Sequence, residues 1–426
     1  MRSEEYTDSP RDEQDSSYTE STERHSFITM IKDAKYLTFL FIGIGLLWPW
    51  NCILGASQYF KHDVFLDNTL WSKIFASSMM TVSTVSSTLF NIWLAKRQHS
   101  YSERVVRGLI WEIIVFIILG ILTLLKSWFS LPFIFISIMV LVAISSVATA
   151  MTQNGIMAVA NVHGPVFSQA VMVGQAVAGV LPSVVLFIIS FSSDPSRQST
   201  GGILFYFLTT AAVSIVSIIL YRVNQIGAKL VNVSPGSSPS SQVPFSVHYD
   251  KLKHLVLSIF TTFVVTLIFP VFASTILVKG LPLANSQFVP FIFTIWNLGD
   301  LYGRIIADWP QFRSPKFTPF KVFVYSLLRM LFVPLFFLFS RVNSSEHTSS
   351  PMVKDLLYTL LQFLFGLTNG HVISISFMKV PEALTTDEEK EAAGGFTNIF
   401  VSAGLTLGSV LSYGCVFIIE SYSKVH

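Results

Sequence analysis

The stretch from Phe293 to Arg304 reads Phe-Thr-Ile-Trp-Asn-Leu-Gly-Asp-Leu-Tyr-Gly-Arg, and it places an acid and a base, Asp300 and Arg304, inside an apolar segment. Their spacing of four residues stacks both side chains on one face of a helix, where they can pair. In a bilayer each such charge costs about 2.5–3.5 kcal/mol at the helix centre, so it normally faces a bundle interior or a watery cavity. The stretch therefore indicates a polar pathway through a membrane protein. The alternatives are an ion pair that only joins helices and an Arg304 that reaches out to the membrane interface.

The composition of the whole chain points to the same environment. Of its 426 residues, 51% are hydrophobic and only 12% are charged, whereas soluble proteins carry about 25% charged residues. The apolar residues gather in runs long enough to cross a hydrocarbon core about 30 Å thick. A formal net charge of +3 is too small to suggest nucleic-acid binding. The motifs of phosphate-binding loops, zinc proteases and paired-cysteine metal sites are missing, so we expect no enzyme, no cofactor and no metal.

The apolar runs predict an all-α polytopic membrane protein with eleven transmembrane helices. A stretch rich in Ser and Pro, Val233–Gln242, reads as a flexible linker and divides six spans from five, which predicts two bundles in a 6+5 arrangement. The expected domains are a disordered tail 1–34, an N-terminal bundle 35–222, a linker 223–251 and a C-terminal bundle 252–426. The expected spans are 35–60, 71–95, 105–125, 130–157, 165–192, 201–222, 252–277, 286–308, 318–340, 355–378 and 392–420.

The distribution of basic residues predicts the orientation. Lys and Arg gather after the second, sixth and eighth spans, and the alternate loops hold only isolated ones. Because cytoplasmic loops are enriched in Lys and Arg, we expect a cytoplasmic N-terminus and a lumenal or extracellular C-terminus. The sequon at Asn343 then falls outside the cytoplasm and could carry a glycan, whereas that at Asn232 falls inside and should stay unmodified.

Polar residues within the spans mark a candidate route for a ligand. In the first span, Pro49 can kink the helix, Trp50 offers a flat aromatic face and Asn51 supplies a donor and an acceptor. Trp50 could equally anchor the helix at the membrane interface. In the fourth span, Gln153 and Asn154 both donate and accept, which suits a neutral heteroaromatic or hydroxylated ligand better than a simple ion. Either amide could instead join neighbouring helices.

Other features of the spans favour structural roles. Arg329 in the ninth span is a second cation in an apolar segment, and we expect it to serve structure or gating. Gly366–Gly370 and Gly404–Gly408 each follow the small-xxx-small pattern of helix contacts. Cys52 and Cys415 lie in apolar runs without metal or redox spacing, so we interpret both as packing residues.

Together these segments resemble the equilibrative nucleoside transporter family over nearly all the spans. The specific elements are Pro-Trp-Asn in the first span and Asp-x-x-Gly-Arg in the eighth. The full set of matching segments is Leu47–Asn51 with Gln58–Phe60, Gln153–Gly155, Gly174–Gly179, Trp296–Arg304, Arg329–Phe336 and Thr368–Gly370.

The resemblance implies a fold similar to the major facilitator architecture and facilitative transport of nucleosides, sometimes nucleobases, by alternating access. It implies a monomer in the lipid bilayer that takes purine and pyrimidine nucleosides. Trp50 would stack on the base, and Gln153 would hydrogen-bond to it. Asp300 and Arg304 would meet the ribose hydroxyls or the base edge, with Asn297 supporting that face and Asn51 lining the same site. Asn369 and Gly404, like Pro49 and Arg329, would serve structure or gating.

The chain departs from the family pattern at several positions. Trp296 stands where phenylalanine is usual, Gly299 replaces a bulky apolar residue and Thr149 replaces a glycine, so the cavity should differ in shape. The short loop Lys61–Leu70 and the compact loops elsewhere are more similar to members of intracellular membranes, which favours a vacuolar or lysosomal membrane over the plasma membrane.

Two other functions remain open on the sequence. A proton-coupled carrier of nucleosides, or of sugars or drugs, would use Asp300 as its titrating group. The second is a receptor or structural protein that does not transport. It does not predict that polar side chains converge on one cavity, as a transporter does for Trp50, Gln153, Asp300 and Arg304.

Overall fold

The computed structural model describes residues 30–66, 69–191, 199–229, 242–267, 273, 276–342 and 350–423. Every regular element within these ranges is a helix. The predicted disordered tail over residues 1–34 falls largely outside these ranges, and so do residues 230–241 of the predicted linker 223–251. The predictions on Asn232 and Asn343 fall entirely outside them.

Most long helices follow the expected spans closely, but the helix at the seventh span begins at Phe245, seven residues before the expected start, and ends at Thr266. The fourth span extends without interruption to His163, because the amides at Gln153 and Asn154 find partners on neighbouring helices and do not break it. The first six long helices are α3 (Ala34–Tyr59), α4 (Leu70–Ala95), α5 (Tyr101–Leu124), α6 (Leu131–His163), α7 (Pro165–Ile189) and α8 (Thr200–Val223). They are followed by α9 (Phe245–Thr266), α11 (Asn285–Ile306), α12 (Pro310–Arg313), α13 (Pro319–Leu328), α14 (Phe332–Val342), α15 (Pro351–Glu382) and α16 (Asp387–Ser423).

Eight helical segments of the described chain are long and apolar enough to cross a membrane. They are α3, α5, α6, α7, α8, the combined segment of α13 and α14, α15 and α16. Helices α4, α9 and α11 contain 26, 22 and 22 residues but do not meet the same test. The multi-pass membrane class is therefore confirmed, and the count of eleven stays a prediction for these three helices.

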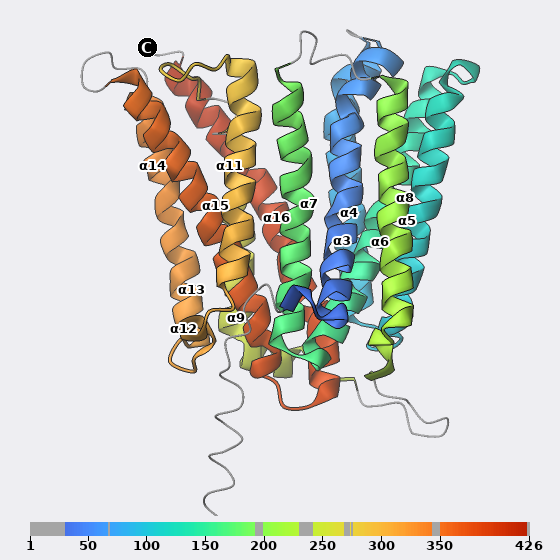
Figure 1. Ribbon diagram of the computed structural model, residues 1–426, viewed down its shortest axis with the longest axis vertical. Coiled ribbons are helices and arrows are strands. Elements are labelled where there is room, and N and C mark those ends of the chain that lie inside the picture. The colour runs from blue at the N-terminus through green and yellow to red at the C-terminus, as the bar shows by residue number, and fades with distance from the viewer. Residues whose placement is uncertain are drawn as a thin grey trace, which may run out of the picture.

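All the long helices run roughly along one axis (Figure 1). Helices α3–α6 and α8 lie to one side and α11–α15 to the other, with α7 and α16 between them. The starts of α3, α7 and α16 lie at one end, here called the lower end after its place in Figure 1, and α16 finishes at the opposite end. The predicted division into two bundles at 35–222 and 252–426 stays a prediction about which parts move as units.

Local sequence signals fix several helix starts. The hydroxyls of Thr69, Ser199 and Thr318 accept hydrogen bonds from backbone N–H groups in the first turns of α4, α8 and α13. Gly164 alone separates α6 from α7, and its φ of +118° is a conformation that a residue with a side chain rarely adopts. The proline that follows, at the first position of α7, needs no N–H donor there.

Two prolines act differently within the spans. Helix α3 continues through Pro49, which is buried. The ninth span instead changes to a short 3-10 helix at Arg329–Leu331 before α14 begins. Pro334 has no N–H to donate to the preceding turn, which explains a change of helix type at this place. The change occurs at the position of the buried cation Arg329.

Four glycines let α11 and α15 cross with their backbones in contact. A Cβ atom added at Gly299 or Gly303 of α11 would collide with backbone carbonyls of α15. Added at Gly366 or Gly370 of α15, it would collide with carbonyls of α11, including that of Asp300. The predicted helix contact at Gly366–Gly370 is therefore confirmed. Gly299 serves this crossing, and its effect on cavity shape stays a prediction.

The second glycine pair joins α16 to α9. A Cβ at Gly404 would lie 2.8 Å from the carbonyl oxygen of Phe260, and one at Gly408 would lie 2.8 Å from that of Val264. This contact confirms the helix-packing role expected from the small-xxx-small pattern.

Candidate functional site

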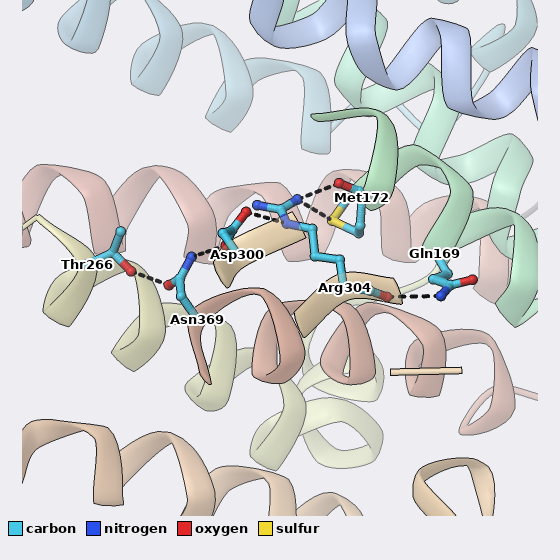
Figure 2. A network of polar contacts seen from close by, with 6 residues as sticks. All are labelled: Gln169, Met172, Thr266, Asp300, Arg304 and Asn369. Atoms are coloured by element: carbon cyan, nitrogen blue, oxygen red, sulfur yellow. Dashed lines mark hydrogen bonds and ion pairs between the residues drawn. The ribbon is translucent and has the colours of Figure 1, made fainter. Parts of the chain in front are cut away.

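The predicted ion pair forms inside the helix bundle. Arg304 Nε donates to Asp300 Oδ2 at 2.8 Å, and only 3% of Asp300 and 7% of Arg304 is exposed. The other carboxylate oxygen, Oδ1, accepts from Asn369 Nδ2 of α15 at 2.6 Å. Asn369 accepts in turn from the hydroxyl of Thr266 in α9 (Figure 2). One polar chain thus connects three helices through residues that lie far apart in the sequence.

The same chain reaches α7 through Arg304. Arg304 Nη1 donates to the backbone carbonyl of Met172 at 2.7 Å. Gln169 Nε2 donates to the backbone carbonyls of Arg304 and Ile305, at 2.9 and 3.2 Å. Figure 2 shows the guanidinium and the main chain of Arg304 each facing a residue of α7. Helix α7 therefore holds Arg304 both by its guanidinium and by its main-chain carbonyl.

The predicted amides contact the next turns of α7. Gln175 Nε2 donates to Gln153 Oε1 of α6 at 2.8 Å. Asn51 Nδ2 of α3 donates to the carbonyl of Ala178 at 2.7 Å. Asn297 lies against the adjacent residue, since a Cβ at Gly179 would come within 2.6 Å of its Oδ1. Asn297 Nδ2 donates to the carbonyl of Phe293 in its own helix, at 2.8 Å.

Met172, Gln175 and Gly179 recur every three or four residues, so they lie along one face of α7. Four predicted residues from three helices meet this face or its edge: Asn51, Gln153, Asn297 and Arg304. Asp300 joins them through its ion pair with Arg304. The structure brings these five together around α7.

Trp50 and Pro49 have different surroundings from these five residues. Trp50 is half-buried and packs against an apolar cluster formed by residues of α3, α4, α5, α6 and α8, including Cys52. Pro49 is buried in the uninterrupted helix α3. Cys52 is a buried free thiol, as expected for a packing residue.

Arg329 is a second buried cation, with 1% of its surface exposed. Its Nε donates to Thr368 Oγ1 and its Nη1 to the carbonyl of Thr262, both at 3.3 Å. The guanidinium lies 5.1 Å from the ring centroid of Phe365, and its Nη2 has no hydrogen-bond partner among the described residues. These contacts hold the 3-10 turn of the ninth span against α9 and α15.

Several polar groups of this region were not foreseen from the sequence. Gln169 and the carbonyl of Met172 act through contacts with α11, a helix that is distant in the sequence, and no local sequence pattern predicts such contacts. Glu112, the single acid within the apolar part of α5, could have been noticed for that reason alone. It is 1% exposed and accepts from Ser145 Oγ at 2.8 Å and Thr149 Oγ1 at 2.7 Å.

A separate hollow of about 390 Å³ lies away from the polar group, and its lining is almost entirely apolar. It is formed by one side chain of α5 and five residues of α6, namely Trp111, Ala143, Ile144, Val147, Ala148 and Met151.

The polar group on α7 can bind an uncharged ligand rich in donors and acceptors. The charges of Asp300 and Arg304 cancel, so the pair attracts neither a cation nor an anion strongly. Each oxygen of Asp300 accepts one hydrogen bond in the structure and retains a lone pair for a second. The paired amides of Gln153 and Gln175 offer both donors and acceptors.

Comparison with known protein families gives a match over most of the chain. The profile of the family described as Nucleoside transporter matches residues 138–235 and 229–417. Nucleoside transporter FUN26 of Saccharomyces cerevisiae is 54% identical, over 92% of this chain and 85% of that protein. Human equilibrative nucleoside transporter 1 is 26% identical, over 89% of this chain and 96% of that protein.

Solved structures with the same fold are more distant in sequence. The proton:xylose symporter XylE of the major facilitator superfamily has a TM-score of 0.61 at 12% identity, over 92% of this chain and 89% of that chain. A bacterial homologue of the iron transporter ferroportin in an outward-facing state has a TM-score of 0.58 at 11% identity, over 88% and 90%. The predicted similarity to the major facilitator fold is confirmed.

Proposed function

The chain belongs to the nucleoside transporter family, and we propose that it is a facilitative carrier that moves nucleosides down their gradient by alternating access. It is a transporter and not an enzyme, as its relatives are. Because a nucleoside carries no net charge, a carrier can move it without a compensating ion.

The observation that carries this proposal is the convergence of neutral amides and one self-compensated ion pair on a single face of α7. A nucleoside offers ribose hydroxyls, which can donate to Asp300, and a base edge that both donates and accepts. Gln175, the partner of Gln153, lies three residues beyond Met172, whose carbonyl accepts from Arg304. The amides and the ion pair are therefore about one turn of α7, or about 5 Å, apart along the helix, a distance that a nucleoside can bridge.

We assign substrate contacts to Asp300, Arg304 and Gln153, with Asn51 and Asn297 holding the neighbouring turn of α7. Trp50 adjoins Asn51 on α3, and we propose that its ring stacks on the base once the ligand is bound. Arg329, Asn369 and Gly404 serve the framework, because their contacts are to α9, α11 and α15 and not to the face of α7. We assign Pro49 to the framework as well, since it is buried within the uninterrupted helix α3.

The conformation supports alternating access. Within the described residues, several hydrogen bonds between helices α3–α8 and helices α9–α16 come from the lower end, where α6 ends and α7 and α16 begin (Figure 1). They include Asn161 to the carbonyl of Lys390 at 3.1 Å and Asn91 to Ser402 at 2.8 Å, besides the contacts of Gln169 and Arg304. If the N-terminus is cytoplasmic, as the basic loops predict, this state is closed toward the cytoplasm.

We further propose that the protein works as a monomer in an intracellular membrane of the vacuolar or lysosomal type. The compact connection between α3 and α4 supports this choice: α4 begins at Leu70, soon after α3 and its π-helical end at Val64. Protease protection of tags at the two termini would test the orientation, and imaging of the tagged protein would test the membrane.

The function is tested by uptake of radiolabelled adenosine and uridine into proteoliposomes, with and without an inward proton gradient. We expect saturable uptake that stops at equilibrium and ignores the gradient. Accumulation above equilibrium driven by protons would replace the facilitative mechanism with a symport through Asp300. No nucleoside uptake by folded protein, with uptake of a sugar or drug instead, would overturn the substrate assignment.

The role of the ion pair is tested against a matched pair on the surface. Glu103 and Arg107 on α5 have the same spacing of four residues and an N–O distance of 2.7 Å, but their side chains are 61% and 65% exposed. Replacing both with alanine should leave uptake unchanged. Normal transport by the corresponding Asp300→Ala, Arg304→Ala protein would place that pair outside the mechanism.

A further inference from the structure

Gln169 is a polar residue in α7 that the proposed transport mechanism does not yet use. Only 1% of it is exposed, and its Nε2 donates two hydrogen bonds, both to backbone carbonyls of α11. Its hydrogen bonds within the described part of the structure go to α11 and not to Gln175 or Gln153, so its role concerns α11 itself.

The two acceptors are groups that α11 cannot satisfy alone. The last four carbonyls of an α-helix have no N–H partner within the helix. Helix α11 ends at Ile306, so the carbonyls of Arg304 and Ile305 are among these four. Gln169 therefore caps the end of α11 from a different helix, inside a region that excludes water.

One turn further along α7, the carbonyl of Met172 accepts from the guanidinium of Arg304 at 2.7 Å. Helix α7 thus holds Arg304 by its main chain and by its side chain at once, as Figure 2 shows. Arg304 is also the residue that the substrate must meet. A single residue consequently lies both in the ligand site and in the contact between the first six helices and the later ones.

We propose that Gln169 and the Met172 carbonyl form a clamp on Arg304 that stabilises the state closed at the lower end, with Gln169 as its positioning residue. This inference rests on the proposed function, since α7 and α11 must separate at this end when the carrier opens there. A ligand that draws the guanidinium of Arg304 away from Met172 weakens the clamp, and this links binding to opening.

The test uses the full chain in lipid, without nucleoside. It measures the distance between two spin labels by pulsed electron paramagnetic resonance. The labels are attached to two exposed positions, Arg107→Cys in the first two turns of α5 and Lys316→Cys between α12 and α13, in a background of Cys52→Ala and Cys415→Ser. The start of α5 and the connection between α12 and α13 both lie toward the lower end (Figure 1). Gln169→Met keeps the size of the side chain and removes its donor. Loss of the two bonds should raise the ratio of open to closed molecules about tenfold.

Gln362→Met is the matched control. Gln362 is also fully buried, and its Oε1 has no partner in the part of the chain that the structure describes. Its Nε2, however, donates to Tyr358 within its own helix, at 2.7 Å. We expect the control to give the distances of the parent protein. The clamp is refuted if folded Gln169→Met gives the parent distances, or if both variants broaden them equally, which would mean a general loss of packing.

The outcome does not depend on nucleoside transport, because the labels report the resting equilibrium. Absence of uptake would therefore contradict the proposed substrate while leaving the distance result standing. Conversely, normal uptake with an unchanged distance in Gln169→Met would contradict the clamp alone.

Discussion

Removing Asp300 should damage the protein more than any change at its surface. In Asp300→Ala, Arg304 remains as a buried cation that is 7% exposed and has lost its partner at 2.8 Å. Breaking a buried pair in this way costs about 3–5 kcal/mol. Asn369 Nδ2 also loses its acceptor at 2.6 Å, which adds about 1–3 kcal/mol. The sum approaches the whole stability of many domains, about 5–15 kcal/mol.

The measurement is the thermal midpoint of the purified protein in detergent, together with uptake per folded molecule. At roughly 2 °C per kcal/mol, Asp300→Ala should lower the Tm by about 8 °C or more. The double variant Asp300→Ala, Arg304→Ala should regain part of that loss, because the unpaired charge is gone, but should not regain transport. A double-mutant cycle isolates the interaction between the two side chains.

The exposed pair Glu103 and Arg107 provides the reference cycle, with an expected coupling of about 0.5 kcal/mol or less. A coupling as small as this between Asp300 and Arg304 would refute the reasoning. So would an Asp300→Ala protein with the Tm of the parent.

Three further predictions concern the substrate site, the helix crossing and the buried acid. Gln153→Ala should spare expression and weaken uptake or shift selectivity, and wild-type rates for every nucleoside would exclude its assigned role. Gly370→Ala places a methyl group against the α11 backbone and should lower the Tm by several degrees, at about 1–3 kcal/mol for overpacking. Gly414→Ala meets no atom within 4 Å and serves as its control in the same melting assay. Glu112→Gln keeps an acceptor and the side-chain shape for the two hydroxyls of α6, so it should keep the Tm. Glu112→Leu leaves both hydroxyls without this acceptor and should lower the stability by about 1–3 kcal/mol, and the Tm with it. Equal melting of the two variants would contradict this role.

Predictions that rest on local spacing were reliable. The four-residue interval between Asp300 and Arg304 gave their ion pair, because a helix places i and i+4 side by side wherever it packs. The interval of Gly366 and Gly370 gave the helix contact for the same reason. The specific motifs around Trp50 and Asp300 led to the correct family.

Predictions that need a partner from elsewhere in the chain were incomplete. Gln153 and Asn51 were singled out as polar residues in apolar helices, but their actual partners on α7 lie 22 and 127 residues away. The apolar surroundings of Trp50 depend on how α3 packs among its neighbours. The change of helix type at Arg329 depends on carbonyl and hydroxyl acceptors in α9 and α15.

The sequence by itself determined the membrane class, most helix limits, the family and the pairing of Asp300 with Arg304. Each of these follows from composition or from neighbours within one helix, where the geometry is the same in every fold. Only the tertiary structure decided that α7 is the helix on which the site is assembled. Gln169 and the Met172 carbonyl reach Arg304 across more than 130 residues of chain, and a backbone carbonyl leaves no mark in the sequence. The Met172 carbonyl gains its role only because the guanidinium of Arg304 lies beside it as a donor. Gln169 gains its role only because α11 ends beside it with carbonyls that lack partners in their own helix.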